Sequence, residues 1–565
     1  MGFQGKSLNL KSGLISLFFI LGLVVISTLC FENCSNSNSG GAPNAASGTP
    51  STPYQLYLQD LAGIPARQTN HGFPRLAIDT QVSFFGNAAN GFLGQQLFSR
   101  LHWFDFVVVD ANTAVVNTFD PGFGPFLGRT GSIRSLNPNT VVTAYFSIAD
   151  YDDDAKGLCY QPFGSSYAFG SDFSTKTCLD STYPGGADDF DIQDWLFHDP
   201  TGAPIKLFQY ADGSFSHIPD PNKLGMRQRY VTTFNNLVVS NYWVDGIYHD
   251  WGGNSVMPNL GPAPGYTVSQ GVSLLNNGVN NLVNIGNVND PVNVEWQTGV
   301  AALYALGRST YPPNFVMVGN SGWGSDPVRY TNYLQGTQLE NFMGCVQNAG
   351  CGWQKAMYTY GTHLKTGQTP NFGFIQVNIN NGTNPADSNH LLYDLMISTG
   401  NNWITEAEFA ELRFGLASAL MFDGYFATDN SNGAYQAALW VDEFSVDSNG
   451  NGVAPTDATA ASALANKGWL GAPKADAYNV SAPTQTLWSV IQAGGLSNNS
   501  NTFVWRRDFA NGITLVNPTS TTQTVTLGGT FHMIKGVVDP TFNAGTTGIT
   551  SVVLPSQTGI VLINN

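Results

Sequence analysis

The sequence predicts an α/β protein built on an eight-stranded (β/α)8 TIM barrel, followed by a small carboxy-terminal antiparallel β-sandwich domain. Between residues 75 and 427, eight short β-prone runs alternate with longer helical or loop stretches. Eight is the number of strands that the closed barrel needs. From about Phe503 the runs become short and alternating, with turn residues such as Asn511-Gly512 between them, which is typical of an antiparallel sheet.

The expected elements follow from these patterns. The eight strands are expected at Arg75–Thr80, Phe104–Asp110, Thr140–Ser147, Val244–Tyr248, Phe315–Val318, Gln338–Glu340, Phe372–Val377 and Gly424–Ala427. The clearest helices are expected at Val231–Val239, Val294–Leu306 and Glu406–Met421. Thr405 and Glu408 stand in capping-box spacing at the start of the last helix. Long insertions follow the third and eighth strands, around Asp150–Asp220 and Asn430–Ser500, where barrel loops typically shape a substrate site.

The amino terminus reads as an export segment followed by a tether. Lys6 and Lys11 precede an apolar run from Leu14 to Phe31, the pattern of a signal peptide, and the run is also long enough to remain as a membrane anchor. Cys30 and Cys34 make a lipoprotein a third alternative, although the residues before them depart from the usual small-residue lipobox. We therefore expect a signal or anchor over 1–31, a tether over 32–53, a barrel over 54–502 and a β-sandwich over 503–565. The expected location is the cell surface or the extracellular space.

Composition excludes some partners and favours others. The 565-residue chain carries 23 basic and 39 acidic residues, a net charge of −16, so it lacks the positive surface that nucleic-acid binding needs. Aromatic residues make up 12% of the chain, and sugars stack on aromatic rings. This favours a polysaccharide or oligosaccharide substrate, and no cofactor or metal is expected. The oligomeric state is not determined by the sequence.

Four cysteines beyond the amino terminus form two locally spaced pairs, Cys159 with Cys178 and Cys345 with Cys351. Such pairs can close short loops in an oxidising compartment. Zinc binding is the rival reading, but no histidine cluster accompanies the pairs and neither has Cys-x-x-Cys spacing. We expect two disulfides.

The decapeptide at 242–251 is the strongest functional signal. Its apolar centre predicts a buried parallel strand, and the strand ends in His249, Asp250 and Trp251 before a glycine-rich loop. Catalytic groups of a barrel sit at the carboxyl ends of its strands. The rival reading is a buried strand with two solvated polar residues at its end.

Carboxylates recur at the ends of the expected strands. Glycoside hydrolysis needs two carboxyl groups across the scissile bond, one as proton donor and one as nucleophile or base. Asp250 ends strand four and Glu340 ends strand six, so both lie on the same end of a closed barrel and form the expected catalytic pair. The alternative is that both only form hydrogen bonds or bind an ion.

Further residues are candidates for substrate contact. They are Asp79, Asp110, His249, Trp251, Asn320, Trp323, Asp429, Trp440, Asp442 and Glu443. Asp110 and Asp150 can equally cap the next element, and Asp442 and Glu443 can equally lie in a solvated loop. Asp245, at the start of its strand, is expected to be structural. The Asp150–Asp154 run is a weak calcium-site alternative that lacks the glycine and spaced glutamate of the helix-loop-helix motif.

Four stretches together resemble the hypothetical glycoside-hydrolase-like family fifteen. They are Val244–Asp250, Gln338–Phe342, Arg413–Ala417 with Phe422–Phe426, and Trp440–Glu443, and Trp505–Phe509, Asn511-Gly512 and Leu515–Pro518 resemble the closing domain of such proteins. The resemblance spans roughly Leu76 to Leu562. It implies a barrel with an appended β-sandwich, with Asp250 as nucleophile and Glu340 as acid/base of a retaining glycosidase. His249 departs from the pattern, because such strands more often carry an aliphatic residue there.

The leading hypothesis is an exported glycoside hydrolase that cleaves an extracellular or envelope polysaccharide. The alternative is a non-catalytic carbohydrate-binding or polysaccharide-assembly protein on a degenerate barrel, since a fold alone does not confer chemistry. Polysaccharide synthesis by transglycosylation would use the same residues.

Overall fold

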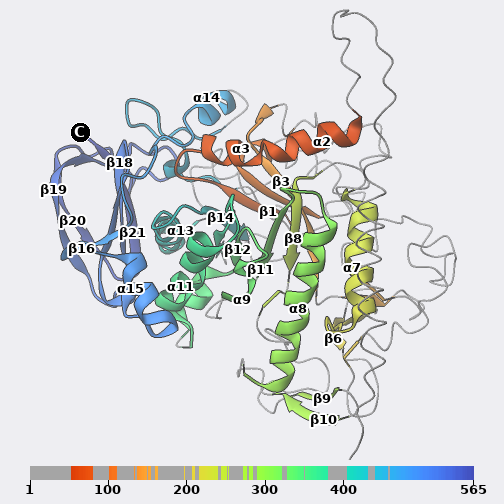
Figure 1. The fold of residues 1–565 in the computed structure, drawn as a ribbon. Helices are drawn as coiled ribbons and strands as arrows, with labels where there is room; N and C mark the ends of the chain where they lie inside the picture. The colour runs from red at the N-terminus through yellow and green to blue at the C-terminus, as the bar shows by residue number, and fades with distance from the viewer. Residues whose placement is uncertain are drawn as a thin grey trace, which may run out of the picture. The chain divides into compact units, whose positions relative to one another are not determined.

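The computed structural model describes most of the chain after the tether. The described residues are 52–80, 101–110, 133, 136–148, 151–153, 160–162, 196–197, 206–209, 215–239, 244–250, 252–253, 272–276, 279–283, 289–320, 328–348, 350–379, 404–430, 439–455 and 459–565. Residues 53–565 form one compact unit, coloured from red to blue along the chain in Figure 1. The expected signal or anchor and most of the tether lie outside the described residues.

Eight parallel strands form the barrel. In hydrogen-bonded order they are β1 (Ala77–Thr80), β2 (Phe106–Asp110), β3 (Val141–Ser147), β8 (Gly246–Asp250), β11 (Val316–Asn320), β12 (Thr337–Leu339), β13 (Phe374–Ile379) and β14 (Tyr425–Asn430). A parallel bridge between Leu76 and Phe426 joins the first strand to the last and completes the ring. Each strand expected from the sequence overlaps one of these, so the predicted barrel is confirmed.

Helices cover the barrel and link its strands. They are α2 (Pro53–Ala62), α3 (Ile64–Asn70), α7 (Leu224–Leu237), α8 (Pro291–Thr310), α9 (Val328–Thr331), α10 (Phe342–Gln347), α11 (Gly352–Thr366) and α13 (Glu406–Ala419). Helices α7 and α8 pack against each other beside β8, as Figure 1 shows. All three helices expected from the sequence are present. The capping box at the start of α13 has both of its hydrogen bonds, between Thr405 and Glu408.

The strand register decides which side chains face the barrel interior. The rings of Phe106 and Tyr248 both contact the ring of Phe374, so these three side chains point inward. Tyr145 is in register with Tyr248 on the neighbouring strand, and its ring stacks on that of Tyr248. Because side chains alternate along a strand, Asp250 lies on the same inward face as Tyr248, whereas His249 lies on the outward face.

Helices α2 and α3 anchor the amino-terminal end of β8. The Arg67 guanidinium forms a buried ion pair with Asp245, with 3.0 Å between Arg67 Nη2 and Asp245 Oδ1. Asp245 also accepts a hydrogen bond from the backbone N–H of Val142. The Tyr57 hydroxyl donates to the carbonyl oxygen of Val244 at 2.8 Å. Asp245 therefore holds this end of the strand in place, as the sequence predicts.

The chain ends in a seven-stranded antiparallel sheet. In sheet order its strands are β16 (Ala482–Thr486), β15 (Tyr478–Asn479), β17 (Trp505–Asp508), β18 (Gly512–Asn517), β21 (Thr558–Asn564), β19 (Gln523–His532) and β20 (Ile549–Leu554). The expected antiparallel sheet is present, but it begins at Tyr478, earlier than the change of sequence pattern at Phe503. Within the described residues these strands form one sheet, where the expected sandwich would have two.

One face of this sheet packs on the barrel, which takes the place of a second sheet. Val516 and Val561 join the large core that includes the barrel, whereas Leu515 and Leu562 on the other face join a smaller core of their own. At Gly559 of β21 a Cβ atom would lie 2.3 Å from the Cβ of Ala417 on α13. Glycine is therefore required at this position by the close approach of strand and helix.

Shorter elements complete the described structure. They are α14 (Ala460–Ala465), α15 (Leu487–Gly494), the strands β4 (Tyr151–Asp153), β5 (Tyr160–Pro162), β6 (Lys206–Gln209) and β7 (Phe215–His217) of a small sheet, the paired strands β9 (Val272–Asn276) and β10 (Val279–Val283), and the 3-10 turns η2 (Leu101–Trp103), η8 (Asp442–Phe444), η9 (Gly495–Ser497) and η10 (Ser500–Thr502). No helix in the described part of the chain combines the length and apolar character needed to cross a membrane.

Candidate active site

Three neighbouring strands bring the two expected catalytic carboxylates together. Asp250 is the last residue of β8, Asn320 is the last residue of β11, and Glu340 directly follows β12. One nitrogen, Asn320 Nδ2, donates to Asp250 Oδ1 at 3.0 Å and to Glu340 Oε2 at 2.7 Å. The amide of strand five therefore bridges the carboxylates of strands four and six.

This shared nitrogen limits the distance between the two carboxylates. Oxygens that lie 3.0 and 2.7 Å from one nitrogen can be at most the sum of those distances apart, about 5.7 Å. The two hydrogens of a planar amide NH2 group diverge by roughly 120°, which places the two oxygens about 5 Å apart. Retaining glycosidases separate their carboxyl groups by about 5–5.5 Å, and inverting enzymes by about 6.5–9.5 Å. The distance between Asp250 Oδ1 and Glu340 Oε2, at most about 5.7 Å, lies below the inverting range.

Asp250 has a second donor, Tyr145 of β3. The Tyr145 hydroxyl donates to Asp250 Oδ2 at 2.6 Å, so each oxygen of this carboxylate accepts a hydrogen bond from a neighbouring strand. Asp250 is 6% exposed. A buried carboxylate with donors on both oxygens is stabilised in its ionised form. Sequence reasoning missed Tyr145, whose inward direction follows from strand alternation but whose contact with Asp250 depends on the register between β3 and β8.

Tyr248 lies one layer deeper in the barrel, where the charges of three carboxylates affect the pKa of its hydroxyl. Burial raises the pKa of Tyr248 well above its usual value, and the charges of Asp79, Asp250 and Glu340 raise it further. Asp79 of β1 therefore contributes its charge to the same interior as Asp250 and Glu340. The Tyr248 hydroxyl donates to Gln338 Oε1, and Gln338 Nε2 donates to Gln376 Oε1, so the floor beneath the carboxylates is polar.

His249 is placed away from this interior, contrary to the substrate-contact expectation. Its ring lies between those of Tyr230 on α7 and Tyr304 on α8, outside the barrel wall. The Tyr230 hydroxyl donates to the carbonyl oxygen of Phe146, so at 2.9 Å it accepts a hydrogen bond from His249 Nδ1, while His249 Nε2 has no partner. Burial, and less strongly the charge of Arg308, lowers the pKa of His249 to about 3. His249 is therefore a neutral packing residue.

Trp440, Asp442 and Glu443 are also placed away from the strand ends. Trp440 is 1% exposed, and its Nε1 donates to the carbonyl oxygen of Val453, so its ring is covered by protein. Asp442 accepts hydrogen bonds from three consecutive backbone N–H groups, those of residues 537–539. Glu443 pairs with Arg413 of α13 at 2.9 Å. All three residues are buried against other parts of the protein, which corrects the expectation of substrate contact.

Other expected site residues are described only in part. Trp251, Trp323, Cys159 and Cys178 lie outside the described residues. Asp110 and Asp429 are placed by their backbones, in register with Tyr145 and Asn378 at the ends of β2 and β14. Cys345 and Cys351 form a disulfide with 5.3 Å between their Cα atoms. The disulfide joins α10 to the start of α11, and both helices follow Glu340 in the chain.

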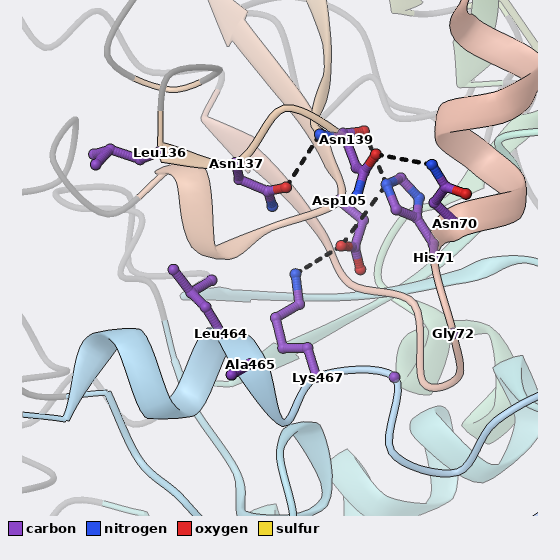
Figure 2. A pocket seen from close by; sticks show the side chains of 11 residues that line it. Asn70, His71, Gly72, Asp105, Leu136, Asn137, Asn139, Leu464, Ala465 and Lys467 are labelled. Carbon is purple, nitrogen blue, oxygen red and sulfur yellow. Dashed lines mark hydrogen bonds and ion pairs between the residues drawn. The ribbon is translucent and has the colours of Figure 1, made fainter.

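A cavity of about 310 Å³ lies at the other end of the barrel. His71 and Asp105, which precede β1 and β2, line it together with Lys467 from the loop after α14 (Figure 2). Lys467 Nζ lies 2.6 Å from Asp105 Oδ1, and His71 Nε2 hydrogen-bonds to the carbonyl oxygen of Asn139 at 2.8 Å. These polar groups satisfy one another at the amino-terminal ends of the strands, so this cavity is separate from the candidate active site.

The described residues contain no group of three or more histidine, cysteine, aspartate or glutamate side chains arranged to hold a metal ion.

The geometry is that of an α/β barrel with two carboxylates, Asp250 and Glu340, at the carboxyl ends of its strands. No family model and no curated protein matches the chain. Solved structures resemble it at low identity. Amy13B of Eubacterium rectale is 12% identical with a TM-score of 0.39, over 88% of this chain and 96% of that one. The cycloalternan-degrading enzyme of Trueperella pyogenes is 12% identical with a TM-score of 0.35, over 90% of this chain and 65% of that one.

A xylosidase from Aspergillus niger is 11% identical with a TM-score of 0.37, over 89% of this chain and 67% of that one. At these identities and TM-scores the similarities carry no argument about the reaction or the residues of this chain.

Proposed function

We propose that this chain is a retaining glycoside hydrolase in which Asp250 is the nucleophile and Glu340 the acid/base. The observation that carries the proposal is the Asn320 amide, whose one nitrogen contacts both carboxylates. A separation of about 5 Å suits a double displacement, in which the nucleophile bonds directly to the anomeric carbon. Inversion would need room for a water molecule between the carboxylate and the sugar.

The hydrogen bonds support this division of roles. Asp250 accepts from Tyr145 and Asn320 on its two oxygens, which favours the ionised carboxylate that a nucleophile must be. Glu340 is half-buried and lies against a second negative charge, and two carboxylates that share a site disfavour joint ionisation. Glu340 is therefore suited to carry the proton that the leaving oxygen needs.

The substrate we propose is an extracellular or envelope polysaccharide, and the chain an exported protein tethered by its amino terminus. This rests on the lysines and apolar run of residues 1–31 and on the aromatic-rich, acidic composition. We place the chain near the hypothetical glycoside-hydrolase-like family fifteen, on the strength of the four sequence stretches that resemble it.

The test is a screen of the full chain on polysaccharides and on 2,4-dinitrophenyl glycosides of both anomeric configurations, beside Asp250→Asn and Glu340→Gln. Each variant is expected to lose more than about 1,000-fold in kcat on a polysaccharide, because each removes an acid/base or a covalent step. Gln376→Glu is not suitable as a control, because Gln376 is hydrogen-bonded to Gln338 beneath the two carboxylates. Glu406→Gln, on the first turn of α13, is the matched carboxyl-to-amide control and is expected to retain full activity.

The product anomer, followed by NMR during the first minutes, is expected to keep the configuration of the substrate. Full activity of either site variant would overturn the assignment, and an inverted product would overturn the retaining mechanism. Carbohydrate binding without turnover by the unmodified chain would favour the non-catalytic alternative.

A further inference from the structure

Tyr145 makes a short hydrogen bond to the proposed nucleophile. Its hydroxyl donates to Asp250 Oδ2 at 2.6 Å, within the range of a charge-assisted O–H···O⁻ hydrogen bond. Its ring stacks on that of Tyr248, with 5.8 Å between centroids and 24° between planes, and the residue is 4% exposed. The buried packing of the Tyr145 ring therefore holds its hydroxyl in place.

We propose that the Tyr145 hydroxyl is a positioning group that favours the release of Asp250 from its covalent intermediate. The inference rests on the proposed function and deepens it, because it assigns Tyr145 to one of the two chemical steps. It follows from how the charge on Asp250 changes during the reaction.

In the first step, an Asp250 oxygen forms a bond to the anomeric carbon while the glycosidic C–O bond breaks. The leaving oxygen takes the proton of Glu340, and the negative charge of Asp250 disappears into an ester. In the second step, a water oxygen bonds to the anomeric carbon while Glu340 accepts a proton from that water. The ester C–O bond breaks, and its electron pair returns to Asp250 as a carboxylate.

A hydroxyl donor binds a carboxylate more strongly than it binds an ester oxygen, because hydrogen bonds to charged groups are about twice as strong as neutral ones. Tyr145 therefore stabilises Asp250 before the first step and after the second. It lowers the nucleophilicity of the carboxylate in the first step and improves its departure in the second. Without the hydroxyl, the covalent intermediate should form readily and decay slowly.

The test variant is Tyr145→Phe, which keeps the stacked ring and removes only the hydroxyl. A hydrogen bond to a charged group exceeds one to a neutral group by about 1–1.5 kcal/mol, so the second step should slow by about 5- to 12-fold. Because the intermediate then accumulates, kcat and KM should fall together while kcat/KM stays the same or rises. A merely structural role would instead lower kcat/KM as far as kcat.

The matched control is Tyr57→Phe. This hydroxyl is equally buried and donates to the Val244 carbonyl oxygen at 2.8 Å, at the amino-terminal approach to β8 and away from Asp250. The control variant loses a hydrogen bond of similar geometry from the same strand region. Its kcat and KM should match those of the unmodified chain.

The experiment uses whichever 2,4-dinitrophenyl glycoside the unmodified chain hydrolyses fastest. Reactions are quenched in acid within seconds, and intact mass and peptide mapping measure the fraction of chain that carries one glycosyl unit on Asp250. The expected result is a burst of dinitrophenol and a majority of labelled Tyr145→Phe, with little label on Tyr57→Phe. If Tyr145→Phe folds poorly, as a melting curve would show, Asn320→Leu removes the other donor to Asp250 and should accumulate the same adduct.

The inference is overturned if Tyr145→Phe loses kcat and kcat/KM equally and no adduct forms, while the unmodified chain still turns over through Asp250. That outcome leaves the proposed function intact. If the unmodified chain turns over no member of the panel, the proposed function fails, and the assignment of Tyr145 fails with it.

Discussion

His249 provides a direct test of the strand orientation, because replacing it should change acid stability and leave catalysis intact. The side chain is 1% exposed, and Nε2 has no acceptor within reach. Protonation would place an unpaired N–H and a positive charge in that packing, so the folded protein holds the ring neutral. The perturbation is His249→Asn, in which the amide nitrogen can replace Nδ1 as donor to Tyr230.

The magnitude follows from the pKa of His249, which burial and the charge of Arg308 lower from 6.5 to about 3. The unfolded chain binds the proton first as the pH falls, so the stability that depends on the neutral ring is complete above pH 6.5 and is lost progressively toward pH 3. At pH 5 the loss is about 2 kcal/mol of unfolding free energy. His249→Asn is expected to be less stable than the unmodified chain at pH 7 because it leaves a gap, but to lose about 2 kcal/mol less between pH 7 and pH 5.

The assay is urea unfolding of the full chain at pH 7 and pH 5, followed by tryptophan fluorescence. His532 is a part-exposed histidine of the carboxy-terminal sheet, and His532→Asn is the matched control for the loss of an imidazole ring. An equal loss of stability in His249→Asn and in the unmodified chain would refute the reasoning about the buried ring. Loss of hydrolysis in a folded His249→Asn protein would refute the outward placement and restore a role in substrate contact.

Two further predictions concern the frame that holds the site. Arg67→Met should lower the free energy of unfolding by about 3–5 kcal/mol, because it leaves Asp245 charged and buried, and the double variant Arg67→Met/Asp245→Asn should recover part of that loss. Unfolding curves measure both, and a single variant as stable as the parent would contradict this expectation. Replacing Cys345 and Cys351 by serine should cost about 2 kcal/mol, since the crosslink spans a sequence separation of 6. Reductant should destabilise the parent more than it destabilises the double serine variant, and an equal response of both would place the effect at another disulfide.

Much of the fold could be predicted from local patterns. A parallel strand covered on both sides needs a continuous apolar run, and the runs around Val107, Val142, Ile247 and Val316 supply it. The polar residue that ends each run marks the carboxyl end of the strand. Asp250 and Glu340 could therefore be named as a pair, because alternate strands of an eight-stranded barrel deliver their ends to one face.

The misplaced residues show where local patterns stop. Strand alternation already implies that His249 and Asp250 cannot both face the interior, so this error could have been avoided from the sequence. Trp440 and Glu443 could not have been placed in this way. Trp440 is hydrogen-bonded to Val453, and Glu443 pairs with Arg413 of α13. Nothing within a few residues of either side chain indicates these contacts.

The sequence alone determined the eight strands, their order along the chain and the two carboxylates at the ends of strands four and six. Hydrophobic periodicity and turn residues encode these features locally. Only the tertiary structure decided that Asn320 bridges Asp250 and Glu340 and that Tyr145 donates to Asp250 across 105 positions of the chain. These contacts depend on the register of neighbouring strands, and register is set when the barrel closes and all of its side chains pack at once.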